Sequence, residues 1–183
     1  MSEENFNPMQ RVKRSLYAMR NGIVADGLRR AGCPYRLVFG VNLPQLNEIA
    51  AGVGKDADLA EALWADSDLR ESALLAPMIY PQEMLTMDKA RELVTHVKWP
   101  EDADILCFKL LRFAPFAGEL AAELARAEVP LKRYTGLRLY FCTLAQHPEA
   151  ALKAAEAELA RPDAISGLAS MLADEARFLI TVE

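Results

Sequence analysis

The sequence predicts an all-α fold in which helices stack in pairs. Hydrophobic residues make up 52% of the 183-residue chain, and alanine and leucine, both strong helix formers, dominate among them. β-branched residues are sparse, and no segment shows the sustained alternation of apolar and polar residues between hairpin turns that indicates a strand. Together these features favour helices throughout the chain.

Proline spacing indicates how the helices are grouped. Six prolines recur every 14 to 19 residues, and each precedes a helical pattern, where the missing N–H would be unpaired in any case. Two such helices make a unit of about 30–35 residues, somewhat shorter than the ~40–47 of HEAT and armadillo repeats. The sequence therefore predicts an α-α superhelix of HEAT/armadillo-like helical repeats. The six prolines are Pro81, Pro100, Pro115, Pro130, Pro148 and Pro162.

Apolar spacing supports individual helices. Leu137, Tyr140 and Phe141 fall on one helical stripe. Residues 105–111 are apolar nearly all round, which predicts a helix packed between neighbours. Asp68 followed by Glu71 resembles a capping arrangement for a helix that runs to Ile79.

The N-terminal region differs from the repeats. Residues 9–31 are predicted to form one long helix, which the sequence Gly32-Cys33-Pro34 ends. Helical repeats are then expected from about residue 43 to 173. No flexible linker rich in glycine or serine interrupts the chain, so residues 1–183 are expected to form a single helical-repeat domain.

Composition and charge limit the cellular location and the binding partners that we expect for the protein. No apolar stretch approaches the ~20 residues that a membrane-spanning helix needs, and the acidic N-terminus has no hydrophobic signal core. We therefore expect a cytoplasmic protein that does not enter membranes. The net charge of −5 and the pI of about 5.2 do not suggest general nucleic-acid binding, although a local basic groove stays compatible with them.

No cofactor or metal site is expected. The three cysteines, Cys33, Cys107 and Cys142, are far apart and form no CxxC pair, so they are interpreted as free thiols of the core. The two histidines, His96 and His147, are too few for a histidine-rich metal site. The chain also lacks a phosphate-binding loop, a nucleophile elbow and an HExxH motif.

Short motifs follow one another in the first half of the chain. They are Phe39–Leu46, Ile49–Ala50, Leu63–Trp64, Arg70–Glu71 and Ala73. Their order and spacing resemble the N-terminal half of the HEAT-like DNA alkylation repair family, in a short and divergent form. There, a phenylalanine-glycine-valine loop and a proline precede the first full repeats, and a leucine-tryptophan pair precedes an arginine-glutamate helix.

The resemblance implies a helical superhelix whose positively charged concave surface cradles duplex DNA. Active members of this family are glycosylases that release N-alkylated purines, such as 3-methyladenine and 7-methylguanine, without flipping the base into a pocket. They use an aspartate together with tryptophans whose faces contact the cationic nucleotide. This chemistry is physically reasonable, because a carboxylate stabilises positive charge that develops on the sugar and aromatic faces attract cations.

Carrying the family's catalytic motif onto this chain gives two candidate catalytic residues, Trp99 and Asp104. The motif is a tryptophan followed four residues later by aspartate, and Trp99 begins the corresponding segment. Ala103 stands at the fourth position, between Asp102 and Asp104, so Asp104 matches only if the helix start is shifted by one residue. Alternatively, these acidic residues complement the helix dipole and Trp99 is a packing residue. The shifted register counts against glycosylase activity.

Five basic residues are expected to contact DNA by the same analogy, because arginine can bind phosphate in bidentate fashion. They are Lys109, Arg112, Lys132, Arg133 and Arg138. Equally, they can form an ordinary solvated face. Two functions therefore stay open: DNA binding of the alkylation repair type, and a non-catalytic scaffold that binds a protein or peptide along the repeat surface, as solenoids do.

Overall fold

The computed structural model describes residues 7–182, and it confirms the all-α prediction over that range. These residues form α-helices and short 3-10 helices, and they contain no strand. None of the helices within residues 7–182 is long and apolar enough to cross a bilayer. The chain divides into a unit that ends at Met84 and a unit that begins at Leu85, and each is described by itself.

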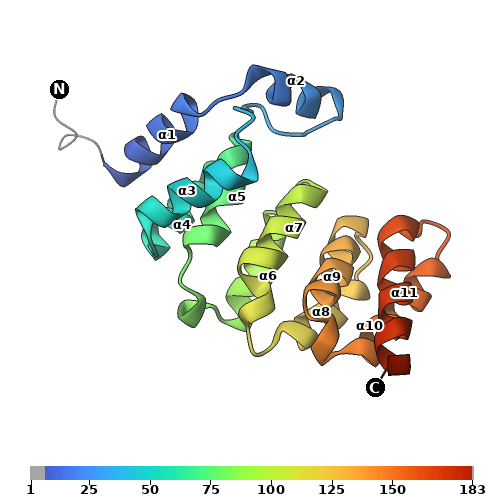
Figure 1. Ribbon diagram of the computed structural model, residues 1–183. Helices are drawn as coiled ribbons and strands as arrows, with labels where there is room; N and C mark the ends of the chain where they lie inside the picture. Colours follow the sequence, from blue (N-terminus) through green and yellow to red (C-terminus); the bar gives the residue numbers. More distant parts are fainter. Residues whose placement is uncertain (1–6, 183) are drawn as a thin grey trace. The chain divides into compact units, whose positions relative to one another are not determined.

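The N-terminal unit contains five α-helices and one short 3-10 helix in its described part (Figure 1). They are α1 (Pro8–Ala18), α2 (Gly22–Arg30), α3 (Leu43–Val53), α4 (Ala57–Ala65), α5 (Arg70–Ile79) and η2 (Gln82–Met84). Helix α5 packs against both α3 and α4, and α1 packs against α3 and α4.

The C-terminal unit contains six α-helices and two 3-10 helices in its described part. They are α6 (Met87–Thr95), α7 (Pro100–Lys109), η3 (Leu111–Phe113), α8 (Ala117–Ala125), α9 (Pro130–Cys142), η4 (Leu144–Gln146), α10 (Pro148–Leu159) and α11 (Ser166–Val182). Helices α8 and α9 pack together, as do α10 and α11, and α7 also packs against α9.

Three of the six prolines open helices at their first residue, as expected. Pro100 begins α7, Pro130 begins α9 and Pro148 begins α10. Pro81 directly precedes the 3-10 helix η2, and Pro115 and Pro162 lie in the turns that lead into α8 and α11. Proline spacing therefore located the junctions between helices better than it located their first residues.

The single long helix predicted over residues 9–31 is wrong. The structure has two helices there, separated at Met19–Asn21. The cause is Asn21, which adopts an extended backbone and accepts hydrogen bonds on its side chain from the amides of Ile23 and Val24. An asparagine that bonds the first amides in this way begins a new helix.

The capping role predicted for Asp68 and Glu71 is also wrong. Leu69 precedes α5 and provides no side-chain cap. Asp68 forms an ion pair with Arg36, with 2.6 Å between oxygen and nitrogen. Glu71 has turned into the interior, where its side chain is fully buried.

The buried Glu71 carboxylate holds the loop between α2 and α3. It accepts hydrogen bonds from the amides of Phe39, Gly40 and Val41 at 3.1, 2.9 and 3.3 Å. The Arg70 guanidinium lies 2.8 Å from the same carboxylate and also donates to the Val41 carbonyl at 3.3 Å. Charge-assisted bonds of this kind compensate the cost of burying the carboxylate. We call this arrangement the Glu71 clamp.

The loop held by the Glu71 clamp positions α2 in turn. Gly40 has a φ of +75°, and a Cβ at this position would overlap the Asn21 carbonyl oxygen and lie 2.7 Å from the Ala25 nitrogen. The Asn21 amide donates to the Phe39 carbonyl at 2.8 Å. Only glycine lets the loop approach the first turn of α2 this closely.

Replacing Glu71 with glutamine should destabilise the protein by about 3 kcal/mol or more, because the buried Arg70 would lose the negative charge of its ion pair with Glu71. Urea-induced unfolding followed by circular dichroism measures this change. The exposed Glu48 of α3 provides the control, and Glu48→Gln should change stability by less than about 0.5 kcal/mol. Equal stabilities for the two variants would contradict the clamp.

Gly136→Ala should destabilise the protein by about 1–3 kcal/mol through overpacking. A Cβ on Gly136 in α9 would lie 2.5 Å from the Ala125 nitrogen and 2.9 Å from the Ala121 carbonyl oxygen, both backbone atoms of the segment packed against it. Gly167 in α11 has nothing within 4 Å of such a Cβ, so Gly167→Ala should be neutral or slightly stabilising. Thermal unfolding of both variants tests this contrast.

Candidate functional site

The two aspartates near Trp99 have different roles in the structure. Asp102 is 5% exposed. Its Oδ2 accepts hydrogen bonds from the backbone amides of Lys98 and Trp99 at 2.9 and 3.0 Å. These bonds satisfy amides that precede the first turn of α7, so Asp102 has the structural role that the alternative interpretation assigned to the acidic residues.

Asp104 lies one turn into α7 and faces α9. Its Oδ1 accepts a hydrogen bond from the Tyr134 hydroxyl at 2.9 Å and lies 2.8 Å from Nε of Arg138. Tyr134 and Arg138 are four residues apart, so they share one face of α9. The Asp104 side chain nevertheless keeps 30% of its surface exposed. The carboxylate is therefore oriented by two donors on a single oxygen and stays accessible.

Burial and the neighbouring carboxylate set the state of the Tyr134 phenol. Burial, with further contributions from the charge and the hydrogen bond of Asp104, raises the pKa of Tyr134 to about 12. The phenol is therefore a neutral donor to Asp104 throughout the physiological range.

Two cysteine thiols lie close to this pair. Burial raises the pKa of Cys107, which is fully buried and donates to the Thr135 carbonyl at 3.5 Å. Burial also raises the pKa of Cys142, while the positive charges of Arg138 and Arg112 lower it. In both thiols burial therefore favours the protonated form.

Cationic and aromatic side chains gather at the end of α7 and in η3. The Arg112 Cζ lies 4.9 Å from the ring centroid of Phe108 and 5.0 Å from that of Phe113. The Lys109 Nζ lies 5.2 Å from the Phe108 ring. Phe108 and Phe113 are 47% and 52% exposed. Residues 105–111 are therefore not enclosed all round, because Phe108 faces solvent.

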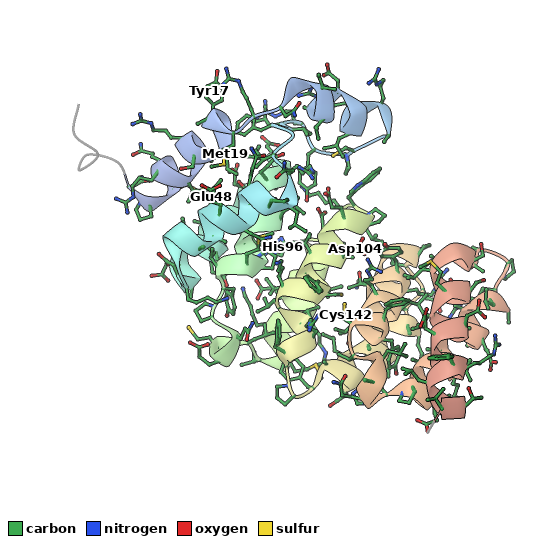
Figure 2. All side chains as sticks on the ribbon, viewed as in Figure 1. Tyr17, Met19, Glu48, His96, Asp104 and Cys142 are labelled. Carbon is green, nitrogen blue, oxygen red and sulfur yellow. The ribbon has the colours of Figure 1, made fainter. Side chains whose placement is uncertain are left out.

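We call Asp104, Tyr134 and Arg138 the α7–α9 cluster. Figure 2 labels Asp104 on α7 and Cys142 at the end of α9, which locate the two helices that contain the cluster. Tyr134 was not among the residues predicted from sequence. Its spacing of four from Arg138 was the signal that could have identified it.

The structure does not bring all of the predicted residues into this cluster. Trp99 is the partly buried residue before α7, and the contacts of Asp104 are with α9 rather than with Trp99. Lys132 is partly exposed in the first turn of α9. Because successive helical residues turn by about 100°, Lys132 and Arg133 lie about 120° and 140° around α9 from Arg138, on either side.

Arg133 is buried in a structural network, with 1% of its side chain exposed. It donates to the Glu158 carboxylate at 2.9 Å, to the Asp163 carboxylate at 2.7 Å and to the Glu128 carbonyl at 2.8 Å. Bonding to Asp163 and then to Glu158 raises the pKa of Arg133 despite its burial. This guanidinium connects α9 to α10 and to the turn before α11, and it is not available to a ligand.

The chemical capacity of the α7–α9 cluster is electrostatic. An oriented carboxylate can stabilise a cation, and the neighbouring guanidinium group can bind phosphate. Among residues 7–182, no group of three histidine, cysteine, aspartate or glutamate side chains is arranged to hold a metal ion.

The Asp104–Tyr134 contact predicts the ionisation of the phenol. Tyr134 should be half-ionised near pH 12, and its contribution to stability should be present below its ordinary pKa of about 10 and lost between pH 10 and 12. Asp104→Asn should lower the pKa of Tyr134, because the negative charge is removed, whereas Glu119→Gln in α8 should not change it. The ¹³Cζ resonance of Tyr134, assigned by its absence in Tyr134→Phe, reports both. An unchanged pKa in Asp104→Asn would show that the two groups are apart in solution.

Comparison with known proteins identifies the family of the chain. The family model described as DNA alkylation repair enzyme matches residues 12–181, which is nearly the whole chain. No curated protein and no solved structure matches the chain significantly. The family match covers both units, including the Glu71 clamp and the α7–α9 cluster. The chain belongs to the DNA alkylation repair enzyme family.

Proposed function

We propose that the protein binds duplex DNA containing N-alkylated purines and that Asp104 is the carboxylate that promotes release of the damaged base. The observation that carries the proposal is the arrangement of Asp104, which two donors from α9 orient while its side chain stays 30% exposed. Family membership gives this arrangement its context, since a DNA repair function follows at the level of the family.

The chemistry requires little of the protein beyond a fixed negative charge. A purine alkylated at N7 or N3 carries a positive charge, so it is a good leaving group. When the bond between C1′ and N9 breaks, both electrons go to the base, which leaves neutral. Positive charge then develops on the sugar, where a preorganised carboxylate stabilises it. Water adds to C1′ and loses a proton.

Tyr134 and Arg138 act as positioning residues in this proposal. Both engage Oδ1 of Asp104, so the carboxylate is held before DNA arrives and no reorganisation is required at the moment of reaction. Arg138 also lowers the local negative potential, which favours the approach of a phosphate backbone.

The cationic and aromatic side chains at the end of α7 and in η3 support contact with nucleic acid. Lys109 and Arg112 are partly exposed next to Phe108 and Phe113. Phosphate attracts the charges, and an exposed aromatic ring can stack on a base without regard to its identity. Arg133 takes no part in this proposal, because its guanidinium is bound inside the protein.

The decisive experiment uses the full chain and a duplex oligonucleotide with one 7-methylguanine, with release of free base measured by chromatography. Asp104→Asn should reduce the release rate by about 10²–10³-fold, the magnitude typical of losing one electrostatic contact to a transition state. It should change DNA affinity much less. Glu119→Gln, an exposed acidic residue of the same unit, should release base at the wild-type rate.

Binding gives a second test. Lys109→Gln combined with Arg112→Gln should weaken binding and reduce the slope of log affinity against log salt by about two, one for each lost phosphate contact. If the wild-type protein shows neither base release nor salt-sensitive DNA binding, the proposal fails. A non-catalytic scaffold for a protein or peptide would then be the better explanation.

A further inference from the structure

Positive charge is concentrated in the first helices of the chain. Residues 7–36 contain seven lysines and arginines and one acidic residue, whereas residues 37–183 contain fourteen basic and twenty-three acidic residues. A segment with a net charge of +6 therefore lies within a protein whose net charge is −5. The seven basic residues are Arg11, Lys13, Arg14, Arg20, Arg29, Arg30 and Arg36.

Helix α1 turns part of this charge outward. Val12 and Leu16 are buried, and helical periodicity places the exposed Arg14 on the opposite face. Tyr17 lies beside that face and is 55% exposed. Figure 2 shows Tyr17 at the end of α1, projecting away from Glu48 on α3, while Met19 lies on the side of α3.

The side chains of Tyr17 and Arg20 pack against each other. The Arg20 guanidinium lies over the Tyr17 ring, with 4.0 Å from Cζ to the ring centroid, and donates to the Tyr17 carbonyl at 2.9 Å. The same ring packs edge-on against Phe39, at 5.8 Å between centroids. Phe39 belongs to the loop held by the Glu71 clamp. The Tyr17–Arg20 pair therefore packs, through Phe39, against a loop that is hydrogen-bonded to the buried Glu71.

Helix α2 adds two more arginines at its last turn. Arg29 donates to the Val38 carbonyl at 3.1 Å and to Asp26 at 2.9 Å, while Arg30 is exposed. Arg20 and Arg29 both line an open hollow of about 500 Å³ that Phe39 also borders. The hollow is wide enough for a phosphate group and has arginine donors in its lining.

We propose that the N-terminal basic surface, formed by Arg14, Tyr17, Arg20, Arg29 and Arg30, binds the phosphodiester backbone of duplex DNA irrespective of damage. The proposal rests on the proposed function only in that both concern DNA. It assigns non-specific affinity to the N-terminal unit, whereas lesion chemistry belongs to the α7–α9 cluster. Arg20 and Arg29 are already held by Tyr17 and by the Val38 carbonyl, so they lose less side-chain freedom on binding phosphate, and counterion release favours the complex.

The structure favours DNA over an anionic membrane as the partner of this surface. A helix that lies in a membrane interface needs an apolar face free to enter the lipid. In α1 and α2 that face is used within the unit, by Val12, Leu16 and Ala25. Ile23 and Val24, at 84% and 39% exposure, are two adjacent apolar side chains in the first turn of α2 and do not extend along the helix as such a face requires.

The test uses the full chain and undamaged duplex DNA. The triple variant Arg14→Gln, Arg20→Gln and Arg30→Gln should bind about 10–100-fold more weakly than the wild type at low salt and should reduce the salt slope by about three. The matched control removes three exposed charges elsewhere, with Arg126→Gln, Lys153→Gln and Arg177→Gln. It should bind within about threefold of the wild type. Thermal unfolding verifies that each variant is folded.

The single variant Arg30→Glu provides a second measure if the triple variant does not fold. It changes one exposed residue at the end of α2 and should weaken binding about threefold or more. Equal losses in the triple variant and its control would overturn the proposal. The proposal would also be overturned if the triple variant lost the binding of the wild type to phosphatidylserine vesicles but kept the wild-type affinity for DNA. Base release from 7-methylguanine duplex at saturating protein should persist in the triple variant, which separates failure of this surface from failure of the proposed function.

Discussion

Each unit is organised by a buried glutamate whose carboxylate must be satisfied by neighbouring donors. Glu71 collects the three amides of Phe39–Val41 together with Arg70. Glu158 accepts from Arg133 and from the Ile165 amide. In both cases an irregular segment supplies donors that would otherwise be unpaired inside the protein. The ion pairs therefore fix the loops, and the loops fix the helices that they connect.

This constraint explains which parts of the fold the sequence could predict. Helical character and the junctions between helices follow from local preferences, such as proline at the start of α7, α9 and α10. The role of Glu71 does not follow from local preferences. The same glutamate side chain can cap its own helix or accept hydrogen bonds from residues some thirty positions away, and the local sequence is the same in both cases. Burial of that side chain, which local sequence cannot show, decides between them.

The candidate site likewise contains residues that the sequence could predict and contacts that it could not. Asp104 and Arg138 were identified one at a time, by analogy with a family, and the structure adds the contact between them and the Tyr134 donor. Arg133 shows the opposite error, since a basic residue was assigned to a surface when its helical position points elsewhere. Counting residues around α9 from Arg138 would have separated the two arginines, but only with Arg138 already known to face α7.

Net charge is a poor guide to nucleic-acid binding for this protein because electrostatic interactions are local. At physiological ionic strength, exposed charges farther apart than about 8 Å are largely screened from one another. A phosphate bound near α2, as we propose, would interact mainly with Arg20 and Arg29, which line one hollow, and would respond little to the acidic residues distributed over the rest of the chain. An overall charge of −5 then limits non-specific adhesion of most of the surface. In both proposals phosphate is therefore held locally, by Arg20 and Arg29 at one hollow and by Lys109 and Arg112 at the end of α7 and in η3.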